Sequence, residues 1–213
     1  MPSWLRRLYM RLTTPSMIGA GSRAYVRWFY AVWARFYDWS VGLDRAYGDN
    51  ARRMVDMSVR DGDRVVDVGI GTGLLADLGA RRAGHWSGID YSGSMLSRAA
   101  NKLAVRRLDN VTLRWGDARR LPYDDDRFDA AVSSFVLPHF APDEKVEVLR
   151  EMARVLRPGG RLGLFLAQGE VAPLFSMRAQ LEQALADAGF VDARFEDRDD
   201  VYRIVNATWA APQ

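Results

Sequence analysis

Short apolar runs alternate with longer segments of helical period along most of this chain. Runs rich in β-branched and aromatic residues predict buried strands at 64–68, 86–90, 111–115, 128–134 and 161–166. Apolar residues spaced three and four apart predict helices at 74–82, 95–107, 142–156 and 173–188, the last followed by two closing strands. The sequence Arg157-Pro158-Gly159-Gly160 predicts a turn before the fifth strand. This alternation predicts an α/β fold: a Rossmann-like, doubly wound, mostly parallel seven-stranded sheet.

The first 60 residues follow a different pattern and predict an N-terminal helical extension. Residues 1–21 are predicted to form an amphipathic membrane-binding arm and a link, with apolar side chains on one arc of a helix and arginines on the other. The apolar arc holds Trp4, Leu5, Leu8, Tyr9 and Leu12, and the opposite side holds Arg6, Arg7 and Arg11. Residues 22–60 are predicted to form a helical lid or cap, including a helix at about 47–59. Two alternatives stay open: the arm could pack on its own domain, and the aromatic stripe over 25–37 could be core packing.

Composition excludes several kinds of chemistry. The 213 residues contain no cysteine and only two histidines, which excludes disulfides, thiolate chemistry and a His-rich metal site, so no metal is expected. The formal net charge is +3, but the first 37 residues hold six arginines and no acidic residue, so the remainder is net acidic. This asymmetry predicts an anionic partner for the N-terminus and disfavours a nucleic-acid partner for the body.

Candidate chemistry gathers where the predicted strands end. The first strand runs directly into residues 69–73, where alternating glycines let the main chain approach a ligand closely. Leu74 stands where a dinucleotide-binding fingerprint has its third glycine, which disfavours a nicotinamide cofactor. Asp90 ends the second strand, about 20 residues further on, where a carboxylate can accept both hydroxyls of a ribose; the alternative is an N-cap for a helix near Ser94. Asp117 follows the third strand at the same edge of the sheet.

Four motifs of this chain, in order, resemble those of the class I S-adenosylmethionine-dependent methyltransferases, over roughly residues 51–163. They are Val66-Asp67-Val68-Gly69-Ile70-Gly71-Thr72-Gly73, Gly88-Ile89-Asp90-Tyr91-Ser92 with Met95-Leu96, Gly116-Asp117-Ala118, and the stretch at 149–160. The resemblance implies S-adenosylmethionine as the cofactor and methyl transfer as the activity. Residues 61–213 would then form the S-adenosylmethionine-binding methyltransferase domain.

The resemblance assigns the methionine and ribose parts of the cofactor to one set of residues. Gly69, Gly71 and Gly73 would let the main chain pass beside the methionine part. Asp67 would orient this loop and, through water, the cofactor's ammonium. Asp90 would hold the ribose diol. The main-chain carbonyl of Ser133 would lie near the methionine end.

The adenine end is assigned to four further residues. Tyr91 and Met95 would lie beside the adenine ring. Asp117 would accept a hydrogen bond from the adenine amine, and the Ala118 N–H would donate to the ring. With the two preceding strand ends, these residues would complete the predicted cofactor site.

The segment after the fourth strand predicts the acceptor end of the site. His139 is the only histidine there, and an imidazole suits a general base near neutral pH; a histidine that caps the next helix or fills the loop is the alternative. Within the family, the chain looks most like the quinone C-methyltransferases and the bacterial phospholipid N-methyltransferases. Some enzymes that methylate ethanolamine head groups use a Tyr–His pair, which implies Tyr25 as the partner of His139, with Tyr30 or Tyr37 as alternatives.

Both of these branches act on lipids, in keeping with the predicted arm. The preferred hypothesis is N-methylation of phosphatidylethanolamine towards phosphatidylcholine at an anionic membrane surface. C-methylation of a ubiquinone or menaquinone precursor, or of another small molecule, is the alternative, and a non-catalytic, membrane-recruited cofactor-binding protein is the alternative of another class.

Ser133-Ser134-Phe135-Val136 departs from the Asn/Asp-Pro-Pro-Tyr/Phe pattern of enzymes that methylate adenine or glutamine nitrogen, so no nucleic acid is expected as a partner. The expected location is cytoplasmic, peripherally associated with the inner face of the membrane.

Overall fold

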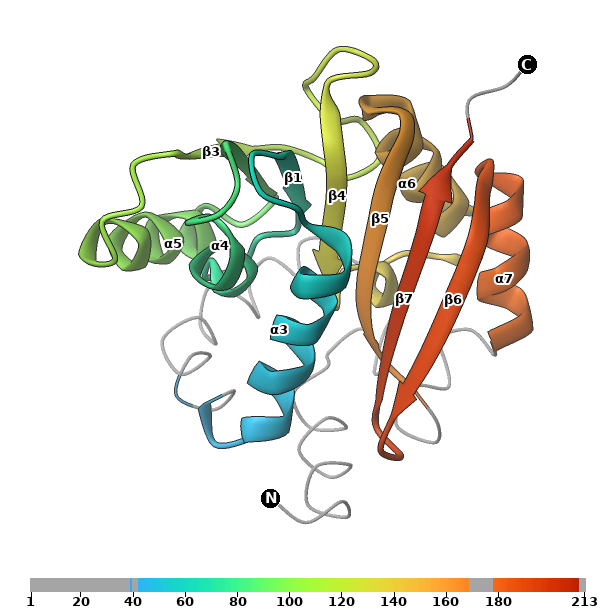
Figure 1. Cartoon of the computed structure of the whole chain (residues 1–213), viewed down its shortest axis with the longest axis horizontal. Helices are drawn as coiled ribbons and strands as arrows, with labels where there is room; N and C mark the ends of the chain where they lie inside the picture. The colour runs from blue at the N-terminus through green and yellow to red at the C-terminus, as the bar shows by residue number, and fades with distance from the viewer. Residues whose placement is uncertain (1–38, 40–41, 169–177, 211–213) are drawn as a thin grey trace.

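A single seven-stranded sheet forms the centre of the computed structural model, which describes residue 39, residues 42–168 and residues 178–210 (Figure 1). The strands are β1 (Arg64–Val68), β2 (His85–Asp90), β3 (Val111–Trp115), β4 (Phe128–Ser134), β5 (Leu156–Ala167), β6 (Phe190–Arg198) and β7 (Tyr202–Trp209). Their order is β3-β2-β1-β4-β5-β7-β6; β7 pairs antiparallel with β5 and β6, and all the other pairs are parallel. The predicted Rossmann-like, mostly parallel sheet is therefore confirmed.

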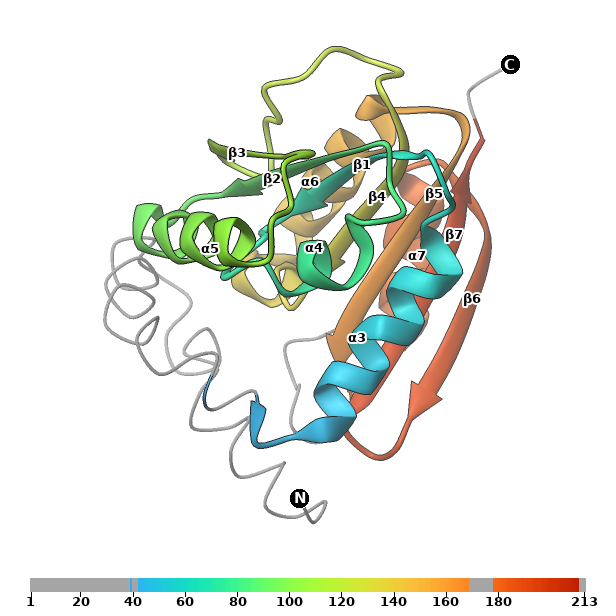
Figure 2. The same cartoon turned by 60° about the vertical axis from the view of Figure 1, so that its left-hand side comes forward.

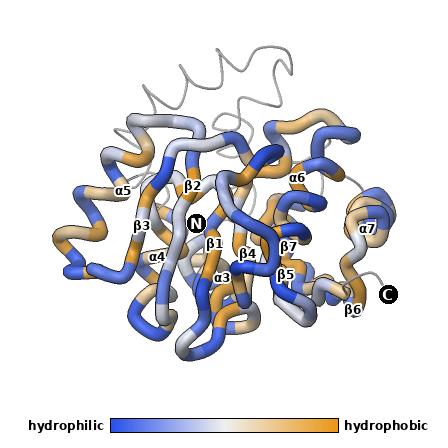
Figure 3. The backbone as a smooth tube through the Cα atoms, turned by 90° about the horizontal axis from the view of Figure 1, so that it is seen from above, coloured by the Kyte–Doolittle hydropathy of each residue, from blue (hydrophilic) through white to orange (hydrophobic). Residues whose placement is uncertain are grey.

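Helices cover both faces of this sheet (Figures 1 and 2). The helices are α3 (Arg45–Ser58), α4 (Leu74–Gly79) and α5 (Gly93–Val105) on one face, and α6 (Pro142–Val155) and α7 (Arg178–Asp187) on the other. One turn of 3-10 helix, η2 (Leu137–His139), links β4 to α6. Figure 3 shows hydrophobic residues along β1 and β4, whose side chains are buried between the two helical layers. Because both faces are covered, the ligand-binding chemistry is left to the edge where the parallel strands end.

Several predicted helix ends differ from the structure by one to three residues, and the structure gives the reason for two of them. The helix after the glycine loop was expected to reach Arg82 but ends at Gly79, because the next residues turn back to the loop before β1; Gly62 N–H donates to Arg82 O at 2.8 Å. α5 begins at Gly93, two residues before the predicted start at Met95. Its N-cap is Ser92, whose hydroxyl accepts from the Met95 N–H.

The Arg157–Gly160 segment is not a turn before the fifth strand but part of β5. Phe128 pairs with Leu156 and Ala130 pairs with Arg161, so β5 carries a bulge between these two pairs. Gly159 lies in this bulge with a φ of 77°, a value that glycine adopts without steric cost. The bulge lets α6 lead into the sheet with no separate linker.

Only part of the N-terminal predictions can be compared with the described residues. The predicted arm at 1–21 and most of the predicted lid at 22–60 lie outside the described residues. The helix expected at about 47–59 is α3, which begins at Arg45 with Asp44 as its N-cap. Among the described residues, no helix combines the length and the apolar composition needed to cross a bilayer.

Candidate cofactor site

The glycine loop that joins β1 to α4 lies at the carboxyl edge of the sheet, and its main chain is anchored to β2. The N–H groups of Gly69 and Ile70 both donate to Ile89 O, at 2.7 and 2.9 Å. Gly69 has a φ of 74°, and a Cβ there would lie 2.0 Å from the Val136 side chain, so only glycine fits. A Cβ on Gly71 would meet no atom within 4 Å. The loop is therefore packed against protein at its first glycine and open at its second.

Asp90, at the tip of β2, is held in place by main-chain donors. Its Oδ2 accepts from the Gly71 N–H at 2.8 Å, and its Oδ1 accepts from the Ser92 N–H at 2.8 Å. Burial raises the pKa of Asp90, and these N–H donors oppose that rise. The alternative of an N-cap is wrong, because Ser92 caps α5. A carboxylate oxygen with one such bond retains a lone pair, so Asp90 can still accept from a diol.

Asp67, near the end of β1, is a fully buried carboxyl group beside Asp90. Its Oδ2 accepts from Trp86 Nε1 at 3.2 Å, whereas its Oδ1 is buried without a hydrogen-bond partner. Burial raises the pKa of Asp67 to about 8; the Trp86 donor lowers it and the charge of Asp90 raises it further. A buried oxygen without a donor is costly, and a ligand that brings an ammonium or an ordered water would satisfy it. The predicted role of Asp67 towards the cofactor's ammonium fits this observation.

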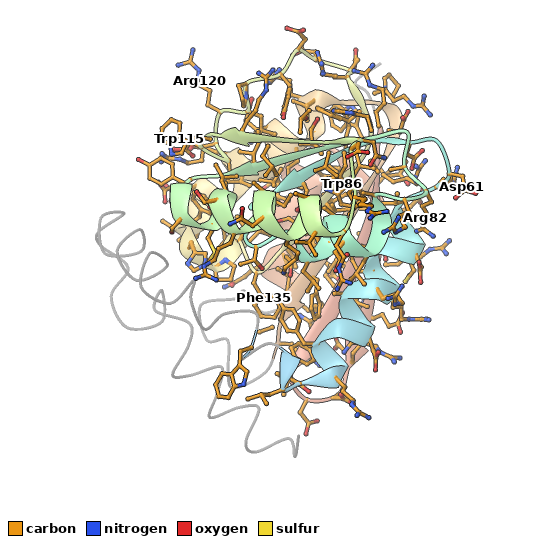
Figure 4. The ribbon with its side chains drawn as sticks, turned by 90° about the vertical axis from the view of Figure 1, so that its left-hand side faces the viewer. Asp61, Arg82, Trp86, Trp115, Arg120 and Phe135 are labelled. Carbon is orange, nitrogen blue, oxygen red and sulfur yellow. The ribbon has the colours of Figure 1, made fainter. Side chains whose placement is uncertain are left out.

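The end of β3 completes the adenine side of the edge. Gly116 N–H donates to Asp90 O at 3.2 Å, which places the third strand tip beside the second. The rings of Tyr91 and Trp115 are 5.1 Å apart, and Trp115 Nε1 donates to Tyr91 O. Figure 4 shows Trp115 at the end of the sheet opposite Asp61. An aromatic pair beside an acidic strand tip, with Trp115 exposed and Tyr91 half-buried, can stack on a flat ring.

Met95 and Ala118 lie on either side of this region. Met95 is buried in the first turn of α5, and Ala118 packs partly buried against the core cluster under α6. Asp117 does not point freely towards a ligand: Arg119 holds both of its oxygens, at 2.5 and 3.1 Å. The sequence prediction missed Arg119, although an arginine two residues after an acidic strand tip is a pattern that could have drawn attention to it.

The end of β4 adjoins the glycine loop from the other side. The hydroxyl of Ser133 donates to Val68 O at 2.8 Å, which ties β4 to the end of β1. Phe135 follows with a φ of 58°, an unusual value for a bulky residue that is typical of strained functional loops. The Tyr47 hydroxyl lies 3.2 Å from Ser134 Oγ, and neither Tyr47 nor Phe135 was singled out from the sequence.

His139 ends η2, the turn that follows Phe135. Burial lowers the pKa of its imidazole to about 4, so the ring is neutral at physiological pH. A neutral ring can accept a proton or a hydrogen bond. Tyr25, the predicted partner of His139, lies outside the described residues, so this pairing stays a prediction. The fold thus brings the glycine loop, Asp67, Asp90 and Ser133 to one edge, with His139 in the segment that follows.

This strand order, glycine loop and pair of acidic strand tips define a Rossmann-like protein that binds a nucleoside-containing cofactor. A solved S-adenosylmethionine-dependent methyltransferase from Aquifex aeolicus shares the fold with a TM-score of 0.64 at 20% identity, over 74% of this chain and 87% of that one. Residues 65–160 also match the family profile described as "Methyltransferase domain".

Two curated relatives extend the comparison. Demethylmenaquinone methyltransferase from Halalkalibacterium halodurans is 40% identical over 125 residues, which are 57% of this chain and 50% of the relative. Phosphatidylethanolamine N-methyltransferase from Cereibacter sphaeroides is 38% identical over 147 residues, 68% of this chain and 66% of the relative. The matched part of the chain thus spans about half the length of the first relative and about two thirds of the second. The chain belongs to the S-adenosylmethionine-dependent methyltransferases, a family whose cofactor is S-adenosylmethionine.

Proposed function

We propose that this protein methylates the amine of phosphatidylethanolamine, using S-adenosylmethionine as the methyl donor. The observation that carries the proposal is the extent of similarity to the Cereibacter sphaeroides enzyme. That alignment covers 147 residues, compared with 125 for the menaquinone enzyme, and both are longer than the methyltransferase-domain match at 65–160. Similarity outside the cofactor-binding segment bears on the acceptor, because the acceptor is what differs within the family.

The residues of the carboxyl edge have the chemistry that the cofactor requires. The bound cofactor supplies an activated methyl group on a sulfonium. Asp90 would accept from the ribose hydroxyls, and Asp67 Oδ1 would accept from the ammonium through water. The open main chain at Gly71 leaves room for the methionine part. Alignment of the acceptor and exclusion of water would then supply much of the rate acceleration.

An amine acceptor places a further demand on the protein. A primary ammonium has a pKa of roughly 10 in water, and it must lose a proton before nitrogen can attack. Burial of the head group favours the neutral amine, and a neutral His139 can accept a hydrogen bond from it. Tyr25 would be the second polar group at the nitrogen. In this proposal, burial of the head group favours loss of the proton, and His139 and Tyr25 orient the neutral amine through hydrogen bonds.

The second candidate is C-methylation of a demethylated quinone precursor. The 40% identity to the menaquinone enzyme favours it. A phenolic hydroxyl next to the acceptor carbon can donate a hydrogen bond to the neutral ring of His139. The two candidates therefore differ in the acceptor and not in the residue that orients it.

The test incubates purified protein with S-adenosylmethionine and vesicles that contain phosphatidylethanolamine and an anionic lipid, followed by lipid mass spectrometry. A parallel reaction contains a demethylated quinone precursor in the same vesicles. Asp90→Ala serves as the variant with impaired cofactor binding, and Asp61→Asn, at an exposed aspartate on the opposite edge, serves as the matched control (Figure 4).

We expect methyl groups on phosphatidylethanolamine with the unmodified protein and Asp61→Asn, and a large loss with Asp90→Ala. Methylation of the quinone precursor alone would replace the first candidate by the second. Absence of product in both reactions, from a protein that binds S-adenosylhomocysteine by calorimetry, would overturn both and favour a non-catalytic cofactor-binding protein.

A further inference from the structure

Arg119 joins the loop after β3 to the first turn of α6, beside the candidate cofactor site. Its Nε and Nη2 donate to the two oxygens of Asp117, at 3.1 and 2.5 Å, and its Nη1 donates to Glu144 Oε1 at 2.6 Å. Asp117 follows β3, and Glu144 lies in the first turn of α6. A bidentate guanidinium–carboxylate pair fixes orientation as well as distance. One side chain therefore sets the position of the Asp117 carboxylate relative to α6.

The contacts of Arg119 with Asp117 and Glu144 form a bridge, which continues from Glu144 into the segment that carries His139. The second oxygen of Glu144, Oε2, accepts from the Ala141 N–H at 3.1 Å, which caps the start of α6. Just before it, Phe140 N–H donates to Leu137 O at 3.2 Å, and His139 N–H donates to Val136 O at 3.0 Å. This tight turn leaves little freedom between the cap and the His139 main chain.

The middle of the β3–β4 loop is held on the same helix by a second arginine. Arg154 donates to Leu121 O, Tyr123 O and Glu151, and Glu151 Oε2 accepts from the Leu121 N–H. The loop is thus attached to α6 at two places. The Arg154 contacts hold the loop at Leu121 and Tyr123, whereas the Arg119 contacts lie at the strand tip that is predicted to hold the adenine.

We propose that Arg119 is a positioning residue that couples the adenine end of the cofactor site, through Glu144, to the turn that carries His139. The inference rests on the proposed function, because it takes Asp117 as the adenine contact and His139 as the group near the acceptor. Cofactor that engages Asp117 fixes the Arg119 guanidinium, and Arg119 fixes Glu144 and the start of α6. Contact of the cofactor with Asp117 is thereby coupled to the position of the acceptor-side turn.

The first test measures binding of S-adenosylhomocysteine by calorimetry. Arg119→Lys keeps the charge but cannot hold both carboxylates in bidentate geometry, so we expect its dissociation constant to rise about tenfold. Arg120→Lys is the matched control: Arg120 is the next residue, its side chain is exposed, and Figure 4 shows it pointing away from the ribbon. Equal affinity for Arg119→Lys and Arg120→Lys, with thermal unfolding unchanged, would overturn the role at the adenine end.

The second test follows the imidazole of His139 by NMR during the same titration. The chain has two histidines, and His85→Gln identifies the other signal, since His85 begins β2 at the opposite edge of the sheet. Glu144→Gln removes the ion pair with Arg119 but keeps an oxygen that can cap Ala141. Asp143→Asn removes one charge from the same helix turn at an exposed position and serves as its control.

We expect S-adenosylhomocysteine to shift the His139 signal in the unmodified protein and in Asp143→Asn. In Glu144→Gln the shift should fall at least twofold, while the dissociation constant stays within about twofold of the unmodified value. An equal shift in Glu144→Gln would show that the ligand affects His139 without this bridge, and the coupling would be wrong. Absence of binding to the unmodified protein would instead contradict the proposed function, so the two failures are distinguishable.

Discussion

Burial of the Asp67 carboxyl makes the stability of this protein depend on pH in an unusual direction. Most carboxyl groups in folded proteins have lowered pKa values and lose their stabilising effect as pH falls. The pKa of Asp67 is raised to about 8, so the folded chain keeps a proton that the unfolded chain has already released above about pH 4. In that window the folded state binds more protons, and this residue makes stability fall as pH rises.

We therefore predict that Asp67→Asn flattens the pH dependence of the free energy of unfolding between about pH 5 and 8. The contribution of Asp67 should approach about 1.4 kcal/mol per pH unit, and asparagine removes it while keeping an oxygen that accepts from Trp86 Nε1. Urea unfolding at several pH values measures the slope, with Asp61→Asn as the exposed control. A slope in Asp67→Asn identical to that of the unmodified protein would show that Asp67 is already ionised in the fold.

His139 gives a second prediction at the scale of one residue. Because burial lowers the pKa of its ring to about 4, the imidazole stays neutral from about pH 5 upward. We predict that kcat shows no histidine-type loss between pH 7 and 6 and that His139→Ala lowers kcat more than it raises the KM for S-adenosylmethionine. Steady-state kinetics over pH 5 to 8 test both points. An acid limb near pH 6.5 that disappears in His139→Ala would contradict the neutral ring.

At the scale of elements, the glycine loop packs closely against the β4–η2 segment. A Cβ at Gly69 would lie 2.0 Å from Val136 Cγ2 and 3.3 Å from Val136 Cβ. We predict that Gly69→Ala abolishes most cofactor binding, since it adds this overlap to a left-handed conformation that costs an L-residue about 1–2 kcal/mol. Binding of S-adenosylhomocysteine by calorimetry is the measurement.

Val136→Ala separates the two costs. It removes both γ-methyl groups, so the double variant Gly69→Ala with Val136→Ala should regain part of the lost affinity but not the part that the backbone conformation costs. Val136→Ala alone is the reference for this cycle. No recovery in the double variant would show that backbone strain, and not the contact with the β4–η2 segment, limits the loop.

The elements themselves also show which parts of this structure are predictable from sequence. The strand at 64–68 and the strand at 128–134 were predicted with their observed bounds, because a short apolar run bordered by polar residues or glycine has few other solutions. Helix ends were less predictable: α4 stops at Gly79, and the chain after it is held by a hydrogen bond from Gly62 to Arg82, residues far apart in sequence. Local patterns carry no information about such contacts.

The residues of the candidate site also divide into those that the sequence predicts and those that it does not. Gly69 and Asp90 could be predicted because their roles follow from local chain geometry and from position at a strand tip. The contact of Arg119 with Glu144 and that of Tyr47 with Ser134 could not, because each partner lies on a distant element; only the pairing of Arg119 with Asp117 is local in sequence. Phe135 was missed because packing imposes its positive φ. The residue types that usually indicate a positive φ in a sequence, glycine and asparagine, are absent at this position.

At the scale of the whole molecule, charge is divided unevenly between the ends of the sequence. The first 37 residues hold six arginines and no acidic residue, whereas the overall net charge is only +3. A net acidic body is repelled by an anionic membrane, so attraction to such a surface must come from the N-terminal segment. The protein would then approach a lipid acceptor in one preferred orientation, with the arm nearest the membrane.

Deletion of residues 1–13 should therefore weaken binding to vesicles of anionic lipid while leaving the affinity for S-adenosylhomocysteine nearly unchanged. A variant with Arg6, Arg7 and Arg11 changed to Gln separates charge from apolar contact: its binding should fall less than that of the deletion and lose most of its dependence on salt. Vesicle sedimentation at low and at physiological ionic strength measures both. Equal binding by the truncated and full chains would show that the arm does not attach the protein to the membrane. The lipid acceptor would then have to reach His139 in a protein that the arm does not hold at the membrane.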